Sequence, residues 1–210
     1  MEGYDACRKI AILSSLISGQ QVDFEDIYTE GITQITKEDM MYAKAMGMTI
    51  KLLACSRRDE DHIHAIVAPY LLSSSHPLYS VNDVFNAIFV HGNVLGDAMF
   101  YGSGAGKLPT ASAVVADVVE MAKNVDKNIP VEWSSKKLEL VDYRSAKNRF
   151  FVRVSGTDKA SVEKIFGNVD YIDAQGVTGE LGFVTEEMTE EALENKKAAY
   201  GEVLNVIRVA

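Results

Sequence analysis

A regular alternation of strand and helix patterns in residues 148–210 places the strongest constraint on how this chain folds. Runs rich in Val, Ile, Phe and Tyr alternate there with short helical patterns. The expected order is strand, helix, strand, strand, helix and strand, over residues 150–155, 158–166, 169–175, 181–187, 190–200 and 203–209. Such a βαββαβ order predicts a four-stranded antiparallel sheet with both helices on one face.

The first 125 residues combine helical patterns with pairs of strands. Helices are expected over residues 5–18, 36–47 and 109–123, and strands over residues 48–55, 62–68, 84–91 and 94–101. A charged turn at residues 57–61 predicts a hairpin of the first two strands. Gly92 and Asn93, a dipeptide that tolerates positive φ, separate the other two. We therefore predict an α+β fold, in which a mixed or antiparallel sheet covered by helices is followed by a ferredoxin-like βαββαβ unit.

A break in the pattern separates these two parts of the chain. Residues 126–147 contain Pro130, Trp133 and mixed charge with weak periodicity. We predict one domain at residues 1–125, a connector at residues 126–147 that contributes one strand, and a second domain at residues 148–210.

Charge and composition exclude several classes of function. A net charge of −9 with scattered basic residues argues against a nucleic-acid partner, which requires clustered Lys and Arg. The longest apolar runs are far shorter than the ~20 residues of a membrane span. Cys7 and Cys55 have no CxxC or metal spacing, which is typical of a cytoplasmic protein, and His62 and His64 have no third ligand to complete a metal site. We expect no nucleic acid, no membrane and no metal.

The first nine residues carry the pattern Gly3-x-Asp5-x-x-x-Lys9 at the start of a helix. Asp5 and Lys9 are four residues apart, so a helix places both side chains on one face. A carboxylate and an ammonium in this arrangement can orient a polar substrate and pass a proton to it. Two other roles fit the same residues: a solvated ion pair, or an N-cap in which Asp5 binds backbone N–H groups.

A glycine-rich loop at residues 101–106 leads into the helix expected at residues 109–123. Its spacing does not fit a P-loop, because only three residues separate Gly102 from Gly106, and it does not fit the dinucleotide fingerprint GxGxxG. Glycines let a flat ring or a substrate approach the backbone closely, and the following helix N-terminus offers free N–H groups. A tight strand-to-helix turn without a ligand explains the loop equally well.

Together these motifs resemble the homoserine dehydrogenase family. The opening pattern matches the end of that family's signature, and residues 102–106 and 109–114 match its glycine loop and the following helix. Residues 30–32 (Glu-Gly-Ile) and 76–78 (His-Pro-Leu) also fit, and the resemblance covers residues 1 to about 123. Nothing corresponds to the family's N-terminal nucleotide-binding domain, so we expect a truncated enzyme.

The resemblance implies an NAD(P)-dependent oxidoreductase that interconverts L-aspartate 4-semialdehyde and L-homoserine in threonine and methionine biosynthesis. It implies that Lys9 is the catalytic residue that transfers a proton and that Asp5 binds the substrate. It also implies that Gly106 and Thr110 lie against the bound NAD or NADP. The cofactor needs the nucleotide-binding domain, so we expect the fragment alone to bind NAD(P) weakly or not at all and to be inactive.

The segment 148–210 is similar to an ACT domain, which many homoserine dehydrogenases carry at this end. The similarity rests on residues 149–154 (Arg-Phe-Phe-Val-Arg-Val), Asp158 and residues 206–209 (Val-Ile-Arg-Val). Ser161 stands where such domains usually place a glycine beside an amino-acid effector, so we expect no strong response to threonine. A free sheet edge predicts a homodimer or higher homo-oligomer. The alternative function is a non-catalytic amino-acid-sensing or oligomerisation protein.

Overall fold

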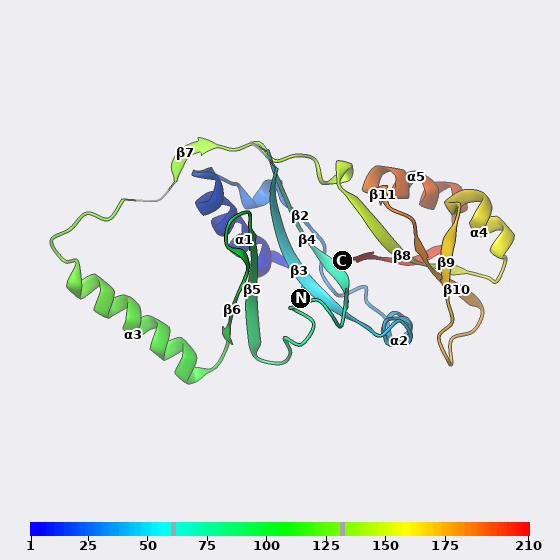
Figure 1. Ribbon diagram of the computed structural model, residues 1–210, viewed down its shortest axis with the longest axis horizontal. Helices are drawn as coiled ribbons and strands as arrows, with labels where there is room; N and C mark the ends of the chain where they lie inside the picture. Colours follow the sequence, from blue (N-terminus) through cyan, green and yellow to red (C-terminus); the bar gives the residue numbers. More distant parts are fainter. Residues whose placement is uncertain (60–61, 131–132) are drawn as a thin grey trace. The chain divides into compact units, whose positions relative to one another are not determined.

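The chain forms two compact units in the computed structural model, which describes residues 1–59, 62–130 and 133–210. The larger unit consists of residues 1–73 and 132–210, and the smaller unit consists of residues 74–131. Within the described residues, the larger unit is built on a mixed sheet of eight strands with helices packed against it (Figure 1). The α+β class predicted from the sequence is confirmed.

Residues 1–73 contribute helices and a long hairpin to the larger unit. The elements are α1 (Tyr4–Ser18), β1 (Gln20–Gln21), the 3₁₀ turn η1 (Phe24–Asp26), β2 (Tyr28–Thr29), α2 (Lys37–Ala45), β3 (Met48–Asp59) and β4 (His62–Ser73). The predicted hairpin is confirmed and is longer than expected, since β3 and β4 pair from Met48 and Ser73 to Asp59 and His62. Glu60 and Asp61 of its predicted turn lie outside the described residues.

The C-terminal segment, residues 147–210, has the predicted βαββαβ order, with the short strand β11 in addition. Its elements, preceded by β7 (Ser134–Lys137) and the 3₁₀ turn η2 (Tyr143–Ser145), are β8 (Lys147–Ser155), α4 (Lys159–Phe166), β9 (Val169–Ile172), β10 (Glu180–Thr185), β11 (Met188–Thr189), α5 (Glu190–Tyr200) and β12 (Val203–Val209). Strands β12, β8, β10 and β9 lie side by side in that order, and each pairing is antiparallel. The strand expected between residues 126 and 147 is β7, which pairs in parallel with β1.

One sheet joins the C-terminal segment to the first 73 residues, which the sequence patterns do not predict. β12 pairs in parallel with β4 through Tyr70–Arg208 and Leu71–Val209. One edge of the predicted four-stranded sheet is therefore covered by β4, and β9 forms its other edge. The division into residues 1–125, 126–147 and 148–210 stays a prediction, because a shared sheet does not itself define where a folding unit ends.

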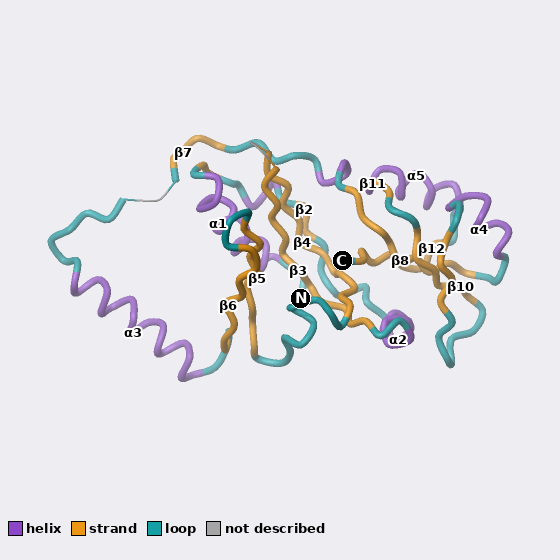
Figure 2. Tube along the Cα trace, in the orientation of Figure 1, coloured by secondary structure: helices purple, strands orange, loops and turns teal. Residues whose placement is uncertain are grey.

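Helices cover both faces of this sheet. On one face, α1 packs against Val67 and α2 packs Tyr42 against Phe151. On the other face, α4 and α5 cover Phe150 and Val152, and Figure 2 shows these helices together beside β8, β10 and β12. Because neighbouring residues of a strand point to opposite faces, Phe150 and Phe151 belong to different cores.

The smaller unit contains a hairpin and a helix. Its elements are β5 (Phe85–Gly92), β6 (Gly96–Ser103) and α3 (Lys107–Lys123). The predicted strand pair is confirmed, but positive φ occurs at Gly96 (φ 75°) and not at Asn93, because the turn spans residues 93–95. Every residue of α3 is at least partly exposed.

Within the described part of the chain, no helix is long and apolar enough to cross a membrane.

Gly182 on β10 lets the ring of Tyr42 lie directly on the strand backbone. A Cβ atom at position 182 would lie 2.6 Å from Tyr42 Cζ. We predict that Gly182→Ala lowers the free energy of unfolding by about 1–3 kcal/mol, because the added methyl group displaces a buried ring. Urea denaturation followed by circular dichroism measures this loss.

The matched control for Gly182 is Tyr42→Leu, which removes the ring from the strand. Adding Gly182→Ala to Tyr42→Leu should cost less stability than adding it to the native chain, because the two sites are in contact. Equal costs in both backgrounds would show that the contact with Tyr42 does not explain the need for glycine.

Candidate functional site

The start of α1 is fixed by Gly3. This residue is buried and has a φ of 86°, a left-handed conformation that favours glycine. A Cβ atom on Gly3 would lie 3.0 Å from Thr29 Cγ2 and 3.2 Å from Val67 Cγ1. Its carbonyl accepts the first helical hydrogen bond, from the Cys7 N–H at 2.9 Å. Contacts with β2 and β4 therefore set where the first turn of α1 begins.

Asp5 and Lys9 are brought together on this first turn, as their spacing predicts. Lys9 Nζ lies 2.7 Å from Asp5 Oδ2, and the two side chains are 67% and 85% exposed. The alternative in which Asp5 caps the helix is wrong, because Gly3 occupies the N-cap position. Asp5 lies inside the first turn, where a carboxylate interacts favourably with the helix dipole. Both charged groups are accessible to a small solute.

Residues 30–32 hold the first residues of the chain in place. A Cβ atom on Gly31 would lie 2.6 Å from the Met1 carbonyl oxygen, so the two backbones are in direct contact. The Ile32 N–H donates to that same oxygen at 3.1 Å, and the Glu30 N–H donates to the Val67 carbonyl at 2.8 Å. The sequence motif at residues 30–32 therefore supports the backbone that leads into α1.

Arg153 and Arg208 are buried cations that the sequence analysis did not identify as functional. Each is 4% exposed and joins the C-terminal segment to carboxylates of the first 73 residues. Arg153 reaches Asp39 of α2, and Arg208 reaches Glu30, in each case through Nη1, at 2.7 and 2.8 Å. Burial disfavours both charged guanidinium groups, but the neighbouring carboxylates outweigh it and raise the pKa of each arginine above its usual value.

The predicted cofactor residues belong to the smaller unit. Gly106 is the N-cap of α3 with a φ of 122°, and the Thr110 N–H donates to its carbonyl at 3.1 Å. The other two glycines of the loop have different surroundings. A Cβ atom on Gly104 would overlap the side chain of Asn86, whereas one on Gly102 would meet nothing within 4 Å. A side chain at Gly104 would thus displace the exposed Asn86 side chain, whereas the backbone conformation of Gly106 favours glycine.

The N-terminus of α4 is occupied by its own side chains at the position predicted for an effector. Asp158 accepts hydrogen bonds from the N–H groups of Ala160 and Ser161 at 3.1 and 3.4 Å. The Ser161 hydroxyl donates to the same carboxylate at 2.6 Å and, with the backbone donors, lowers the pKa of Asp158. Asp158 therefore caps the backbone N–H groups at the start of α4.

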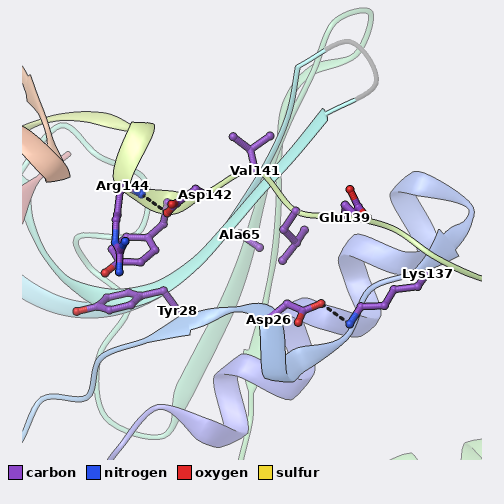
Figure 3. Close-up of a pocket in the computed structure, with 10 residues that line it drawn as sticks. Asp26, Tyr28, Ala65, Lys137, Glu139, Val141, Asp142 and Arg144 are labelled. Atoms are coloured by element: carbon purple, nitrogen blue, oxygen red, sulfur yellow. Dashed lines mark hydrogen bonds and ion pairs between the residues drawn. The ribbon is translucent and has the colours of Figure 1, made fainter.

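A cleft of about 730 Å³ in the larger unit lies between β2 and the stretch from β7 to η2 (Figure 3). Two of its charged lining residues form an ion pair, in which Lys137 Nζ lies 2.8 Å from Asp26 Oδ2. Tyr28 and Tyr143 stack with ring centroids 4.0 Å apart. None of the predicted site residues lines this cleft.

Among the described residues, no group of three or more His, Cys, Asp or Glu side chains is placed to hold a metal ion.

Comparison with known sequences points to one family. Residues 1–119 match the family model described as homoserine dehydrogenase. The homoserine dehydrogenase of Bacillus subtilis is 47% identical over 125 residues, which are 60% of this chain and 29% of that protein. The homoserine dehydrogenase of Mycobacterium bovis is 41% identical over 169 residues, which are 77% of this chain and 38% of that protein.

Solved structures give the same result. A homoserine dehydrogenase from Thiobacillus denitrificans matches with a TM-score of 0.84 and 29% identity, over 100% of this chain and 53% of that chain. A homoserine dehydrogenase from S. aureus matches with a TM-score of 0.76 and 30% identity, over the same shares. The chain spans about half of these structures and between 29% and 38% of the two curated relatives. Because the family model matches more than half of its residues, the chain belongs to the homoserine dehydrogenase family.

Proposed function

We propose that this chain forms the substrate-binding and proton-transfer part of an NAD(P)-dependent homoserine dehydrogenase, which interconverts L-aspartate 4-semialdehyde and L-homoserine in the cytoplasm. The observation that carries the proposal is the Asp5–Lys9 pair, 2.7 Å apart on the first turn of α1, within the segment that matches the family model. Reduction of an aldehyde places negative charge on its oxygen, and a nearby ammonium stabilises that charge.

Lys9 and Asp5 have different tasks in this proposal. The Lys9 ammonium donates a proton to the developing alkoxide and takes it back in the reverse direction. The Asp5 carboxylate binds the ammonium end of the amino-acid substrate through charge-assisted hydrogen bonds. Since both side chains project from one helical turn, the substrate is oriented by one residue and protonated by the other.

The loop before α3 fits the flat, polar nicotinamide end of a cofactor. Gly106 carries no side chain at a φ of 122°, and within the described residues the N-cap of α3 makes no side-chain hydrogen bond to the backbone N–H groups of the first turn. We assign Gly106 and Thr110 to contact with NAD or NADP. A bound NAD(P)H supplies the hydride for the aldehyde carbon. Because the matched residues cover only 29% and 38% of the Bacillus subtilis and Mycobacterium bovis relatives, we expect the 210 residues alone to bind NAD(P)H weakly and to turn over little substrate.

The C-terminal segment is proposed to be an ACT-like unit that serves association more than sensing. Two observations support this assignment. Asp158 occupies the N–H groups that an effector would use, and β9 is the sheet edge left for a second copy of the chain, because β12 is paired with β4.

The proton-transfer role of Lys9 is tested in the Bacillus subtilis relative with its matched 125-residue segment replaced by that of this chain. We predict that Lys9→Ala in this chimera lowers kcat by about 10²-fold or more, the usual scale for loss of a general acid. Steady-state kinetics with L-homoserine measures the effect. Lys44→Ala, at an exposed lysine in the last turn of α2, is the control and should leave kcat unchanged. A near-normal kcat for Lys9→Ala would refute the assignment.

The substrate-binding role of Asp5 predicts a different kinetic effect. In the same chimera, Asp5→Ala should raise the KM for L-homoserine about tenfold or more, because a charge-assisted hydrogen bond is lost. Glu38→Ala removes a first-turn carboxylate from α2 and should leave KM unchanged. If both variants raise KM by the same factor, Asp5 acts only through its negative charge and not through contact with the substrate.

The cofactor contact at Gly106 is tested against a second glycine with positive φ. Gly106→Val and Gly96→Val both place a branched side chain at a left-handed position, with φ of 122° and 75°. We predict that Gly106→Val raises the Kd of the chimera for NADPH at least about tenfold, because its side chain fills the contact surface. Gly96→Val should lower stability but leave Kd within about twofold. Fluorescence titration of NADPH gives both values, and equal Kd values would show that Gly106 serves only the turn.

A further inference from the structure

The guanidinium group of Arg208 bridges two carboxylates that are far apart in the sequence. Its Nε and Nη2 donate to Glu190 Oε1 and Oε2 at 2.6 and 3.0 Å, and its Nη1 donates to Glu30 Oε2 at 2.8 Å. The side chains of Arg208 and Glu190 are each 5% exposed, and that of Glu30 is 31% exposed. One cation therefore holds α5 of the C-terminal segment and the residue that follows β2.

Electrostatic attraction holds Arg208, Glu190 and Glu30 in a fixed arrangement. Burial raises the pKa of Glu190, and Arg208 counteracts this effect by favouring the ionised carboxylate. Charge interactions are stronger in a water-poor interior, and a planar guanidinium holds a carboxylate in one orientation when it binds both oxygens. Removing the cation would leave Glu30 and Glu190 facing each other without a counter-charge. The position of the Glu30 side chain thus depends on Arg208.

Glu30 is connected to the start of α1 by direct backbone contacts. Its neighbour Gly31 lies against the Met1 carbonyl, and the Ile32 N–H donates to that carbonyl at 3.1 Å. A Cβ atom on Gly3 would lie 3.6 Å from the Glu30 carbonyl oxygen. A shift of residues 30–32 therefore moves residues 1–3, on which the first turn of α1 is built.

Arg153 provides a natural comparison. It has the same exposure as Arg208 and also joins the C-terminal segment to an acidic residue of the first 73 residues. Its partners are Thr36 and Asp39 at the N-terminus of α2, together with Glu180 of β10. The contacts of Arg153 thus lead to α2, and those of Arg208 lead to α1.

We propose that Arg208 is a positioning residue for Asp5 and Lys9. By holding Glu30, it fixes the segment against which the start of α1 rests, so the C-terminal segment determines the placement of the substrate-binding and proton-transfer groups. This inference rests on the proposed function of Lys9 and Asp5. It assigns a kinetic role to a residue that touches neither substrate nor cofactor.

Site-resolved amide hydrogen exchange of the full chain tests the structural link without enzyme activity. We expect Arg208→Met to raise exchange at Ile32 and Cys7 at least tenfold, because their N–H groups bond to Met1 and Gly3. Arg153→Met should raise exchange at Met40, whose N–H bonds to Thr36, and leave Ile32 and Cys7 within about twofold. Unchanged exchange at Ile32 and Cys7 in Arg208→Met, or equal increases in both variants, would overturn the proposal.

A milder variant keeps the test decisive where Arg208→Met does not fold. Glu30→Gln removes the charge that Arg208 holds but retains the size of a partly exposed side chain. It should raise exchange at Ile32 and Cys7 in the same way, at least fivefold. Exchange that matches the native chain at both amides would count against the link.

The kinetic arm uses the Thiobacillus denitrificans enzyme with its matched half replaced by all 210 residues. Arg208→Met should raise the KM for L-homoserine at least fivefold and lower kcat by a smaller factor, because Asp5 lies nearer the displaced residues than Lys9. Arg153→Met should change neither constant beyond about twofold, and an equal effect of both variants refutes the positioning role. If Lys9→Ala leaves kcat intact while exchange responds as expected, the proposed function fails and the link from Arg208 to α1 stands.

Discussion

The parallel pairing of β4 with β12 is the contact on which the larger unit depends. It runs through Tyr70–Arg208 and Leu71–Val209 and is extended by the Ala210 N–H, which donates to the Leu71 carbonyl at 3.0 Å. A strand pairing determines which strands are neighbours and also which residues of the two strands lie opposite each other. The β4–β12 pairing therefore sets where the C-terminal segment lies against α1 and α2. Two buried arginines add long-range contacts between the same parts of the chain. Arg153 binds Asp39 of α2, and Arg208 binds Glu190 of α5 and Glu30.

Local patterns predict most elements of this fold. The β3–β4 hairpin and the βαββαβ order follow from periodicity and nearby turns, which are properties of neighbouring residues. At two positions the folded chain differs from these local signals. Asp5 is a good N-cap residue, yet Gly3 takes that position because its backbone packs against Thr29 and Val67. The positive φ of the second hairpin moved to Gly96 because the turn spans residues 93–95.

The partners of the two buried arginines cannot be identified from the sequence alone. Arg153 and Arg208 each interrupt an apolar strand, and a lone charge in such a run signals a buried ion with a partner elsewhere. The pattern does not name that partner, since Glu30 lies 178 residues from Arg208. The same limit applies to the candidate site. The motif places Asp5 and Lys9 on one helical face, but the support from Gly31 and Glu30 arises only from the folded chain.

The Asp5–Lys9 ion pair is exposed to solvent, whereas the start of α1 that carries it is held firmly in place. Asp5 and Lys9 are 85% and 67% exposed, and in bulk water the interaction of two charges is weak. An ammonium stabilises a developing alkoxide strongly only when water is excluded. The left-handed Gly3 and the tight contact of Gly31 with Met1 leave the start of α1 little freedom to move toward a substrate. Under the proposed function, the exclusion of water from Asp5 and Lys9 therefore depends on what binds over α1 and not on a movement of α1 itself.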